Sequence, residues 1–278
     1  FGMSGDNYRK MKQLLRIPHG IIYFTGPTGS GKTTTLYSVL QYLSSRLVNI
    51  VTIEDPVERN LPKINQIQVN DRAGLNFQTG LRSILRQDPD IIMIGETRDP
   101  ETAEISARAA ITGHLVFSTL HTNDAASSVT RLMDMGIPAY LAAASIAGIV
   151  SQRLMRKVCP YCQEEYEARP EELKILYGKP AAPGEHVRLR RGKGCYLCNE
   201  TGYKGRIAIH EILSVDAEMK RMISEGRKED ELKAYAIRSH GMTTLKEEAV
   251  KMVLAGITTF EEMERLVYTI DMDYFGED

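Results

Sequence analysis

Net charge, long apolar runs and cysteine are all scarce in this 278-residue sequence. Its 35 basic and 36 acidic residues leave a formal net charge of −1, so the chain as a whole does not suggest a surface for nucleic acid or an anionic membrane. The longest weakly polar run, residues 139–150, is much shorter than the roughly 20 residues that span a bilayer. No transmembrane helix is therefore expected. The only cysteines are four residues between positions 159 and 198.

The remaining composition is that of an ordinary globular protein. Hydrophobic residues make up 42% of the chain and charged residues 26%, which is enough for a large core and predicts one large domain with smaller appendages. The sequence begins at Phe1 without an initiator methionine. This start is typical of a fragment, and a signal or an upstream domain could precede it.

A phosphate-binding loop is the strongest motif. An apolar stretch of strand length, residues 20–25, precedes the loop, and residues 34–43 have the composition of a helix. In this context the glycines let backbone N–H groups surround phosphates at a helix N-terminus, which predicts a nucleotide site. Lys32 is expected to reach the β- and γ-phosphates, and the Thr33 hydroxyl to bind Mg²⁺. The residues expected to hold the nucleotide are Gly26, Pro27, Thr28, Gly29, Ser30, Gly31, Lys32, Thr33 and Thr34.

Two acidic segments follow apolar strands. Residues 49–53 read as a buried strand that ends in Glu54, Asp55 and Glu58, and in an open parallel sheet this is the edge where ligands bind. A solvated acidic turn is the alternative. A second apolar strand ends at Glu96, after Gly95, and resembles the second phosphate-binding motif of P-loop enzymes except that the acid is a displaced glutamate. The sequence therefore leaves open which of Glu58 and Glu96 binds Mg²⁺ and which activates the attacking water.

Arginines and histidines near these strands are weaker candidates. Arg82 and Arg86 share one face of a helix expected over residues 77–86, where they are either surface charges or part of the site. His114 and His121 bracket a strand expected over residues 115–120. They are either structural residues or sensors that report a γ-phosphate by hydrogen bonding.

Other elements follow from hydrophobic periodicity and capping residues. Residues 63–70 suggest a short strand or hairpin outside the main sheet, residues 140–150 are helical by composition, and residues 206–213 alternate as a strand. The other expected helices cover residues 6–15, 101–111, 125–135, 217–223, 229–239, 244–254 and 259–267.

The cysteines form two pairs, Cys159–Cys162 and Cys195–Cys198, each with two residues between its members. This spacing lets four thiolates bind one tetrahedral metal, and it predicts a structural Zn²⁺ site, with disulfides as the alternative. The 32 intervening residues, 163–194, exceed the usual zinc-ribbon range and read as an excursion that includes a helical patch at 171–177.

Basic residues cluster around the cysteines. Such a basic zinc knuckle could bind nucleic acid, but the balanced charge favours a solvated face or a docking surface for an acidic protein segment or membrane headgroups. The cluster consists of Arg153, Arg156, Lys157, Arg188, Arg190, Arg191, Lys193, Lys204 and Arg206.

Four segments in order resemble the Walker A, Asp box, Walker B and His box of the secretion ATPase superfamily. They are residues 26–33, 52–58, 91–99 and 112–121. The resemblance is closest to the type II secretion and type IV pilus assembly ATPases and covers essentially the whole chain. It implies a RecA-like α/β fold in a homo-hexamer that hydrolyses ATP to ADP in the cytoplasm, peripherally at the inner membrane, and works with secretion or pilus platform proteins there.

The resemblance also assigns residues. It implies that Lys32 and Thr33 take the phosphates and Mg²⁺, that Glu58 and Glu96 share the catalytic and metal-side roles, and that Arg82 and Arg86 lie at a nucleotide or subunit interface. We expect His121 to be one of the catalytic residues, and Glu54 and His114 to be among the residues that bind the nucleotide. The family carries an upstream domain that covers the nucleotide and that this chain is expected to lack.

The expected organisation has three parts. These are a RecA-like ATPase domain over residues 1–153, a tetracysteine zinc module over 154–206 and a C-terminal helical subdomain over 207–278. The tetracysteine module matches the secretion and assembly branch rather than the retraction branch. No nucleic-acid partner is expected. The alternative function is a RecA-like nucleic-acid-dependent ATPase that uses the zinc and basic cluster on DNA.

Overall fold

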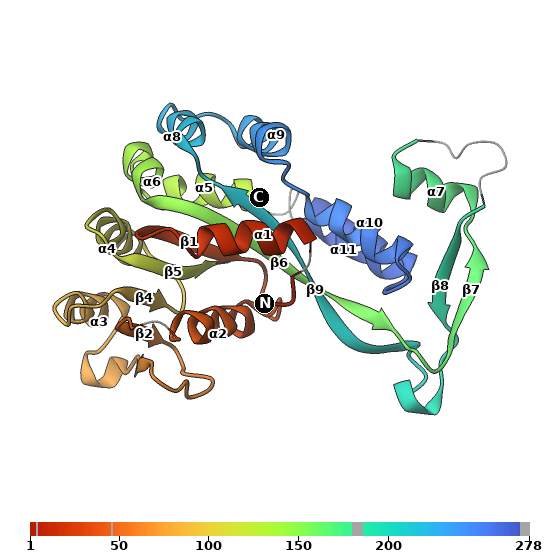
Figure 1. The fold of residues 1–278 in the computed structure, drawn as a ribbon, viewed down its shortest axis with the longest axis horizontal. Coiled ribbons are helices and arrows are strands. Elements are labelled where there is room, and N and C mark those ends of the chain that lie inside the picture. The colour runs from red at the N-terminus through yellow and green to blue at the C-terminus, as the bar shows by residue number, and fades with distance from the viewer. Residues whose placement is uncertain (4, 46, 180–185, 273–278) are drawn as a thin grey trace. The chain divides into compact units, whose positions relative to one another are not determined.

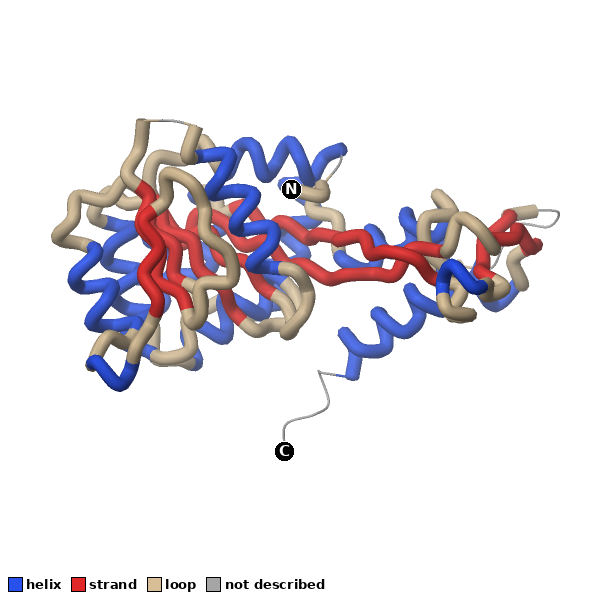
Figure 2. Tube along the Cα trace, turned by 90° about the horizontal axis from the view of Figure 1, so that it is seen from below, coloured by secondary structure: helices blue, strands red, loops and turns tan. Residues whose placement is uncertain are grey.

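The computed structural model describes residues 1–3, 5–45, 47–179 and 186–272 (Figures 1 and 2). The chain divides into two compact units. Unit 1 comprises Phe1–Gln152 and His210–Thr243, and unit 2 comprises Arg153–Ile209 and Thr244–Asp278. Two long strands, β6 and β9, carry the chain from one unit to the other.

A seven-stranded sheet in the order β3-β2-β4-β5-β1-β6-β9 forms the centre of unit 1 (Figure 1). The first six strands in this order pair in parallel, so their carboxyl ends meet at one edge of the sheet. This edge is where α/β sheets bind ligands. The strands are β1 (Gly20–Thr25), β2 (Ile50–Glu54), β3 (Asn65–Gln68), β4 (Ile91–Ile94), β5 (Leu115–Leu120), β6 (Ile146–Val158) and β9 (Tyr203–Ser214).

Helices cover both faces of the sheet, which is why its central strands are apolar throughout. Alternate residues of β1 belong to two different cores: Ile21 and Tyr23 pack with α3, α4, α5, α6, α8 and α9, whereas Ile22 and Phe24 pack with α1 and α2. The predicted α/β fold is thus confirmed. The helices of unit 1 are α1 (Gly5–Leu14), α2 (Lys32–Leu43), α3 (Phe77–Ile84), α4 (Pro100–Ile111), α5 (Ala125–Asp134), α6 (Ala139–Ser145), α8 (Ala217–Ser224) and α9 (Glu229–His240).

Unit 2 has its own core. Met155, Leu189 and Ile209 pack there with residues of the three helices α7 (Pro170–Tyr177), α10 (Leu245–Leu254) and α11 (Phe260–Met272). A two-stranded antiparallel sheet joins β7 (Gln163–Glu167) to β8 (Arg188–Gly192). None of the helices in the described ranges combines the length and apolarity needed to cross a bilayer.

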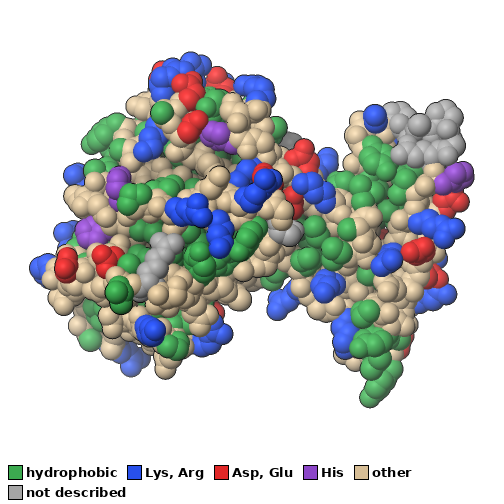
Figure 3. Space-filling model, viewed as in Figure 1, with side chains coloured by type: hydrophobic (Ala, Val, Ile, Leu, Met, Phe, Trp, Pro, Cys, Tyr) green, Lys and Arg blue, Asp and Glu red, His purple; other side chains and the backbone are tan. Residues whose placement is uncertain are grey.

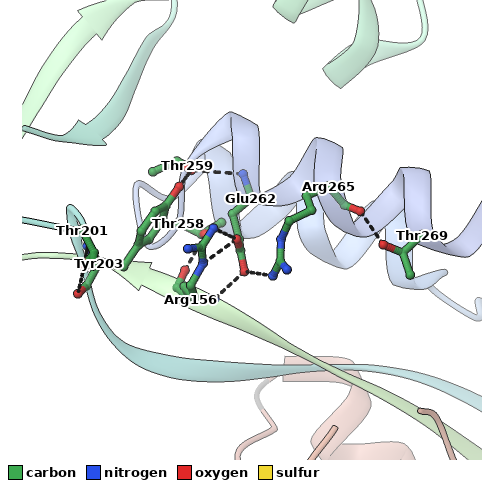
Figure 4. A network of polar contacts seen from close by, with 8 residues as sticks. All are labelled: Arg156, Thr201, Tyr203, Thr258, Thr259, Glu262, Arg265 and Thr269. Atoms are coloured by element: carbon green, nitrogen blue, oxygen red, sulfur yellow. Dashed lines mark hydrogen bonds and ion pairs between the residues drawn. The ribbon is translucent and has the colours of Figure 1, made fainter. Parts of the chain in front are cut away.

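A buried carboxylate joins α11 to β6 within unit 2 (Figure 4). Glu262, only 1% exposed, accepts from Arg156 at 2.6 Å and from Arg265 at 2.9 Å. The Arg156 guanidinium also lies 4.0 Å from the centre of the Tyr203 ring, and the Tyr203 hydroxyl lies 2.7 Å from that of Thr259. The arginines hold the pKa of Glu262 below its usual range despite burial, so the carboxylate stays charged.

Two elements, and the division of the chain into parts, differ from the expectations. Residues 65–68 are not outside the main sheet: β3 is its edge strand and pairs in parallel with β2. The expected helix over 140–150 ends at Ser145, and residues from Ile146 onward form β6. The strand at 65–68 was expected but its place was wrong, because local alternation does not reveal which strand it pairs with. The helix over residues 146–150 was wrong because periodicity alone cannot tell a fully buried apolar strand from a buried helix.

The four C-terminal helices exist as expected, but they do not form one body. Met219 of α8 and Leu232 of α9 pack in the main core of unit 1, whereas Leu245 of α10 and Met263 of α11 pack in the core of unit 2. The units of the structure therefore have different boundaries from the expected three parts. Residues 180–185 of the excursion between the cysteine pairs lie outside the described residues.

Candidate nucleotide site and cysteine cluster

The phosphate loop connects β1 to α2 at the carboxyl edge of the sheet. A side chain at Gly26 would place its Cβ 2.4 Å from the backbone oxygen of Gln152, so only glycine fits there. Gly31 has a φ of 85°, which also favours glycine. Pro27, Thr28 and Gly29 are exposed, and Thr33 is half-buried at the start of α2. The loop and the first turn of α2 thus present backbone N–H groups beside an accessible surface.

Lys32 lies within this loop. Its ammonium group donates to the carbonyl oxygens of Gly26 at 2.6 Å and Pro27 at 3.1 Å, and the side chain is largely buried. A phosphate oxygen can replace a carbonyl as the acceptor for this charge, with a gain because the bond becomes charge-assisted on both sides. Lys32 is therefore in a position to bind an anion held by the loop.

Glu96 and His121 lie together beside the loop. The buried Glu96 carboxylate pairs with Arg98 at 2.6 Å and lies 3.8 Å from His121 Nε2. Burial and the positive charge of Lys32 hold the pKa of His121 below its usual range, although Glu96 opposes this shift. Lys32, Glu96 and His121 therefore form one electrostatic cluster, as expected for residues that follow β1, β4 and β5 at one edge.

The two candidate acids after β2 have different surroundings. Glu54 is buried and accepts from Tyr37, from Thr52 at 2.5 Å and from Gln66 at 3.0 Å, so its oxygens are committed to the protein. Burial, together with Glu54, raises the pKa of Tyr37 to about 12. Glu58 is exposed, and its backbone N–H donates to the Tyr37 hydroxyl at 3.1 Å. Of the two, Glu58 is the carboxylate open to solvent.

Three predicted site residues lie outside this cluster. Arg82 is exposed on α3 and pairs with Glu101 at 2.6 Å, and Arg86 follows α3 and lies 3.5 Å from the Ser83 hydroxyl. His114 precedes β5, at the opposite end of the strand from His121, and its Nδ1 lies 2.9 Å from the backbone oxygen of Ala109. A six-residue strand separates the two histidines by about 20 Å, so they cannot act on one ligand within the chain.

The residues behind the loop were not found from the sequence. Gln152 on β6 bonds to Ser30 and Thr35 of the loop and of α2, and to His210 on β9. The available signal was a polar residue ending an apolar run next to a phosphate loop. The expectation of a helix over 140–150 concealed it, because only a strand beside β1 brings Gln152 to the loop.

The four cysteines form a compact cluster in unit 2. Their sulfur atoms all lie within 4.8 Å of one another, and all four thiols are free of disulfides. The Sγ–Sγ distances are 4.0 Å for Cys159–Cys195, 3.8 Å for Cys162–Cys198 and 3.7 Å for Cys195–Cys198. A Zn–S bond of about 2.3 Å gives tetrahedral S–S edges of about 3.8 Å. The donor set therefore fits a tetrahedral Zn²⁺ ion.

Backbone N–H groups favour a thiolate at one cysteine of this cluster, Cys198. The N–H groups of Cys195 and Gly202 donate to Cys198 Sγ at 3.2 and 3.3 Å. Burial raises the pKa of Cys198, but these N–H groups outweigh it and hold that pKa at about 6. Gly192 and Gly202 flank the second cysteine pair and approach each other closely, since a Cβ at Gly192 would lie 2.1 Å from the backbone oxygen of Gly202. Glycine at 192 thus allows the segments on either side of Cys195 and Cys198 to come together.

Carboxylates neutralise much of the basic cluster near the cysteines. Arg188 and Arg190 pair with Glu165, Arg191 and Lys193 pair with Glu164, and Arg156 pairs with Glu262. Figure 3 shows acidic and basic side chains interspersed over β7 and β8. This pairing is typical of a solvated face and does not favour a phosphate-backbone surface.

Comparison with known proteins identifies close relatives. The family described as "Type II/IV secretion system protein" matches residues 1–265. The type IV pilus assembly ATPase PilB of Thermus thermophilus is 49% identical over 262 residues, which are 94% of this chain and 29% of that protein. The type II secretion system protein HxcR of Pseudomonas aeruginosa is 47% identical over 265 residues, which are 95% of this chain and 52% of that protein.

Solved structures share the fold. The pilus retraction motor PilT with bound ADP is 30% identical with a TM-score of 0.68, covering 92% of this chain and 64% of that one. The ATPase DotB of Legionella pneumophila has the same TM-score of 0.68 at 23% identity, covering 96% of this chain and 64% of that one. The chain thus spans about half or less of the two curated relatives and under two thirds of these two structures.

Proposed function

Because the chain belongs to the type II/IV secretion system protein family, we propose that it is the ATP-hydrolysing part of a motor for type II secretion or type IV pilus assembly. The observation that carries this proposal is the cluster of Lys32, Glu96 and His121 around an accessible phosphate loop. The relatives reported above, which are described as secretion proteins and pilus ATPases, give no support to a nucleic-acid-dependent ATPase.

The residues at the sheet edge divide the work. Lys32 and backbone N–H groups of the phosphate loop and of the first turn of α2 bind the phosphates of ATP or ADP, and the Thr33 hydroxyl and Glu96 hold Mg²⁺, directly or through water. When bound, Mg²⁺ neutralises charge on the phosphates. Glu58, which is open to solvent, orients or deprotonates the attacking water, while Glu54 holds the end of β2 through its three hydrogen bonds. His121 reports the γ-phosphate through a hydrogen bond.

A structural Zn²⁺ ion belongs to the same proposal. Cys159, Cys162, Cys195 and Cys198 fill all four positions of a tetrahedral site, so the site offers no open position for water and has no catalytic role. Its role is to hold together the two cysteine loops of unit 2.

Assembly and location complete the proposal. The full-length protein works as a homo-hexamer in the cytoplasm, peripherally at the inner membrane, and docks on platform proteins of a secretion or pilus system. Arg82 and Arg86 are exposed and lie outside the cluster of their own chain, which suits a role at the nucleotide of a neighbouring subunit. The interspersed charges of unit 2 suit a protein partner rather than nucleic acid.

Phosphate release from ATP tests this function. Wild-type protein is expected to hydrolyse ATP, Lys32→Ala to be inactive, and Glu96→Gln to bind ATP without turnover. Glu58→Gln is expected to lower turnover with little change in affinity. Single-stranded DNA is added in parallel. Stimulation that falls steeply with salt would favour the nucleic-acid alternative, and normal turnover by Glu96→Gln would refute its assignment.

A further inference from the structure

Gln152 lies directly behind the phosphate loop. It is on β6, the strand next to β1, one residue beyond the pair that joins Thr25 to Ser151. Its side chain is only 1% exposed. A buried amide needs hydrogen-bond partners, and here those partners come from three different segments of unit 1.

The side-chain amide makes three hydrogen bonds. Nε2 donates to the backbone oxygen of Ser30 at 2.7 Å, and Oε1 accepts from the Thr35 hydroxyl at 2.8 Å. His210 Nε2 lies 3.2 Å from the same Oε1. Burial lowers the pKa of His210 to about 4, so the imidazole is neutral at physiological pH and donates from Nε2. These two donors fix Oε1 toward them and leave Nε2 directed at Ser30.

The bond to Ser30 controls an N–H group of the loop. In a planar trans peptide, the carbonyl of one residue and the N–H of the next point in opposite directions. Holding the Ser30 oxygen on the Gln152 side therefore turns the Gly31 N–H away from Gln152. Glycine at 31 tolerates several backbone conformations, so the peptide would otherwise be free to rotate. In a phosphate loop this N–H is one of those that bind the anion.

We infer that Gln152 is a positioning residue that holds the Ser30–Gly31 peptide in the orientation that binds phosphate. This inference rests on the proposed nucleotide site. Gln152 does not touch the nucleotide; it acts through the loop backbone, and Thr35 and His210 orient its amide. The amide is buried behind the loop, so its effect is on the affinity for the phosphates rather than on the base.

Isothermal titration with Mg²⁺–ADP tests the inference with two nearly isosteric variants. Gln152→Met removes the donor to Ser30, whereas Thr35→Val removes one bond to Gln152 and leaves that donor in place. Gln152→Met is expected to weaken ADP and pyrophosphate by the same factor, about 10-fold or more for one lost hydrogen bond. Thr35→Val is expected to weaken both by less than about 3-fold. Urea unfolding of each variant shows whether the losses merely follow stability.

Hydrogen exchange of the ligand-free protein is the second readout, and it does not depend on nucleotide binding. Exchange of amides in residues 26–32 should accelerate in Gln152→Met and stay near wild type in Thr35→Val. If Gln152→Met fails to fold, Gln152→Asn, whose amide is one methylene shorter, carries the same expectations.

The inference would be overturned if Gln152→Met kept the ADP affinity and the hydrogen exchange of the wild type. It would also be overturned if both variants lost affinity in proportion to their loss of stability. Absence of ADP binding by the folded wild type would refute the proposed site and the inference with it, whereas ADP binding unaffected by Gln152→Met refutes the inference alone.

Discussion

Buried polar residues near the phosphate loop determine what the site can do. Lys32 donates to two carbonyl oxygens of its own loop, so its ammonium group has hydrogen-bond partners before any phosphate arrives. Glu96 is balanced by Arg98, which is itself exposed. Both charges can therefore exchange their partners for a ligand without an intermediate state in which a buried charge is unpaired, and such a state would be costly.

His210 makes stability depend on pH. Its pKa is about 4 in the folded protein and about 6.5 in an unfolded chain, so between these values only the unfolded chain binds the proton. The contribution of His210 to the free energy of unfolding is therefore complete above pH 6.5 and lost as the pH falls toward 4. Urea unfolding should show a loss of about 2 kcal/mol from this residue between pH 7.5 and pH 5.

His210→Gln is the control for this prediction. Its amide can still donate to Gln152 but does not titrate. The variant should lose less stability than wild type over the same pH range, by about the contribution calculated for His210. Equal losses in the two proteins would show that His210 is protonated in the folded state.

At the scale of helices and strands, local patterns predicted most elements of the fold. The strand before the phosphate loop, β5 and the helices that begin after capping residues agree with the structure within about two residues, except that α11 extends to Met272, five residues beyond its expected end. Asp99 caps α4 and Asp124 caps α5, both by accepting from backbone N–H groups. Such caps and short apolar runs act over a few residues, so the sequence alone reveals them.

The errors came from interactions that are distant in sequence. A strand was expected within residues 63–70, but its place in the main sheet follows only from its pairing with β2. The apolar start of β6 is a strand because β1 lies beside it. The carboxyl ends of parallel strands meet at one edge of a sheet, and this rule places Lys32, Glu96 and His121 together because each follows a recognisable strand. The rule does not place Gln152 beside His210, because their contact requires the pairing of β6 with β9.

The ion pair between β6 and α11 should contribute measurably to the stability of unit 2. Arg156 donates to the buried Glu262 from both Nε and Nη2 and lies over Tyr203, whereas the more exposed Arg265 makes one bond. Arg156→Ala is expected to cost about 1.5–3 kcal/mol, because it removes charged hydrogen bonds from a buried carboxylate.

Arg265→Ala, the matched control, should cost less than about 1 kcal/mol, as for an exposed ion pair. Chemical denaturation, monitored by hydrogen exchange in α11, measures the loss of stability in both variants. A larger loss in Arg265→Ala than in Arg156→Ala would contradict the structure of this network.

The cysteine cluster predicts one zinc per chain. Protein prepared without chelator should contain about one equivalent by elemental analysis, and Cys198→Ser should lose it because a thiolate ligand is missing. Hydrogen exchange in β7 and β8 should then accelerate, while Mg²⁺–ADP affinity stays within about 3-fold of wild type, since the phosphate site is local to one strand, loop and helix. Zinc-free wild-type protein, or two disulfides in its mass, would contradict this prediction.

In the proposed hexamer, Arg82 or Arg86 of one chain lies at the nucleotide of its neighbour. An arginine supplied by another subunit is worth about 10³–10⁵ in the rate of P-loop enzymes. ATP turnover per chain should therefore rise with protein concentration. Arg82→Ala and Arg86→Ala should lower this turnover without changing ADP affinity. Arg108→Ala, which removes an equally exposed arginine paired with Glu104, is the control and should leave turnover unchanged. Concentration-independent turnover would contradict a shared site.

Titration of wild type and Lys32→Ala with Mg²⁺–ADP measures whether nucleotide binds at the phosphate loop. One ADP should bind per wild-type chain. Lys32→Ala should lose about 10- to 100-fold in affinity, because a charge-assisted bond to phosphate contributes about 1.5–3 kcal/mol. Equal affinity in the two proteins, or no binding by a folded wild-type chain, would show that the phosphate loop is not the nucleotide site.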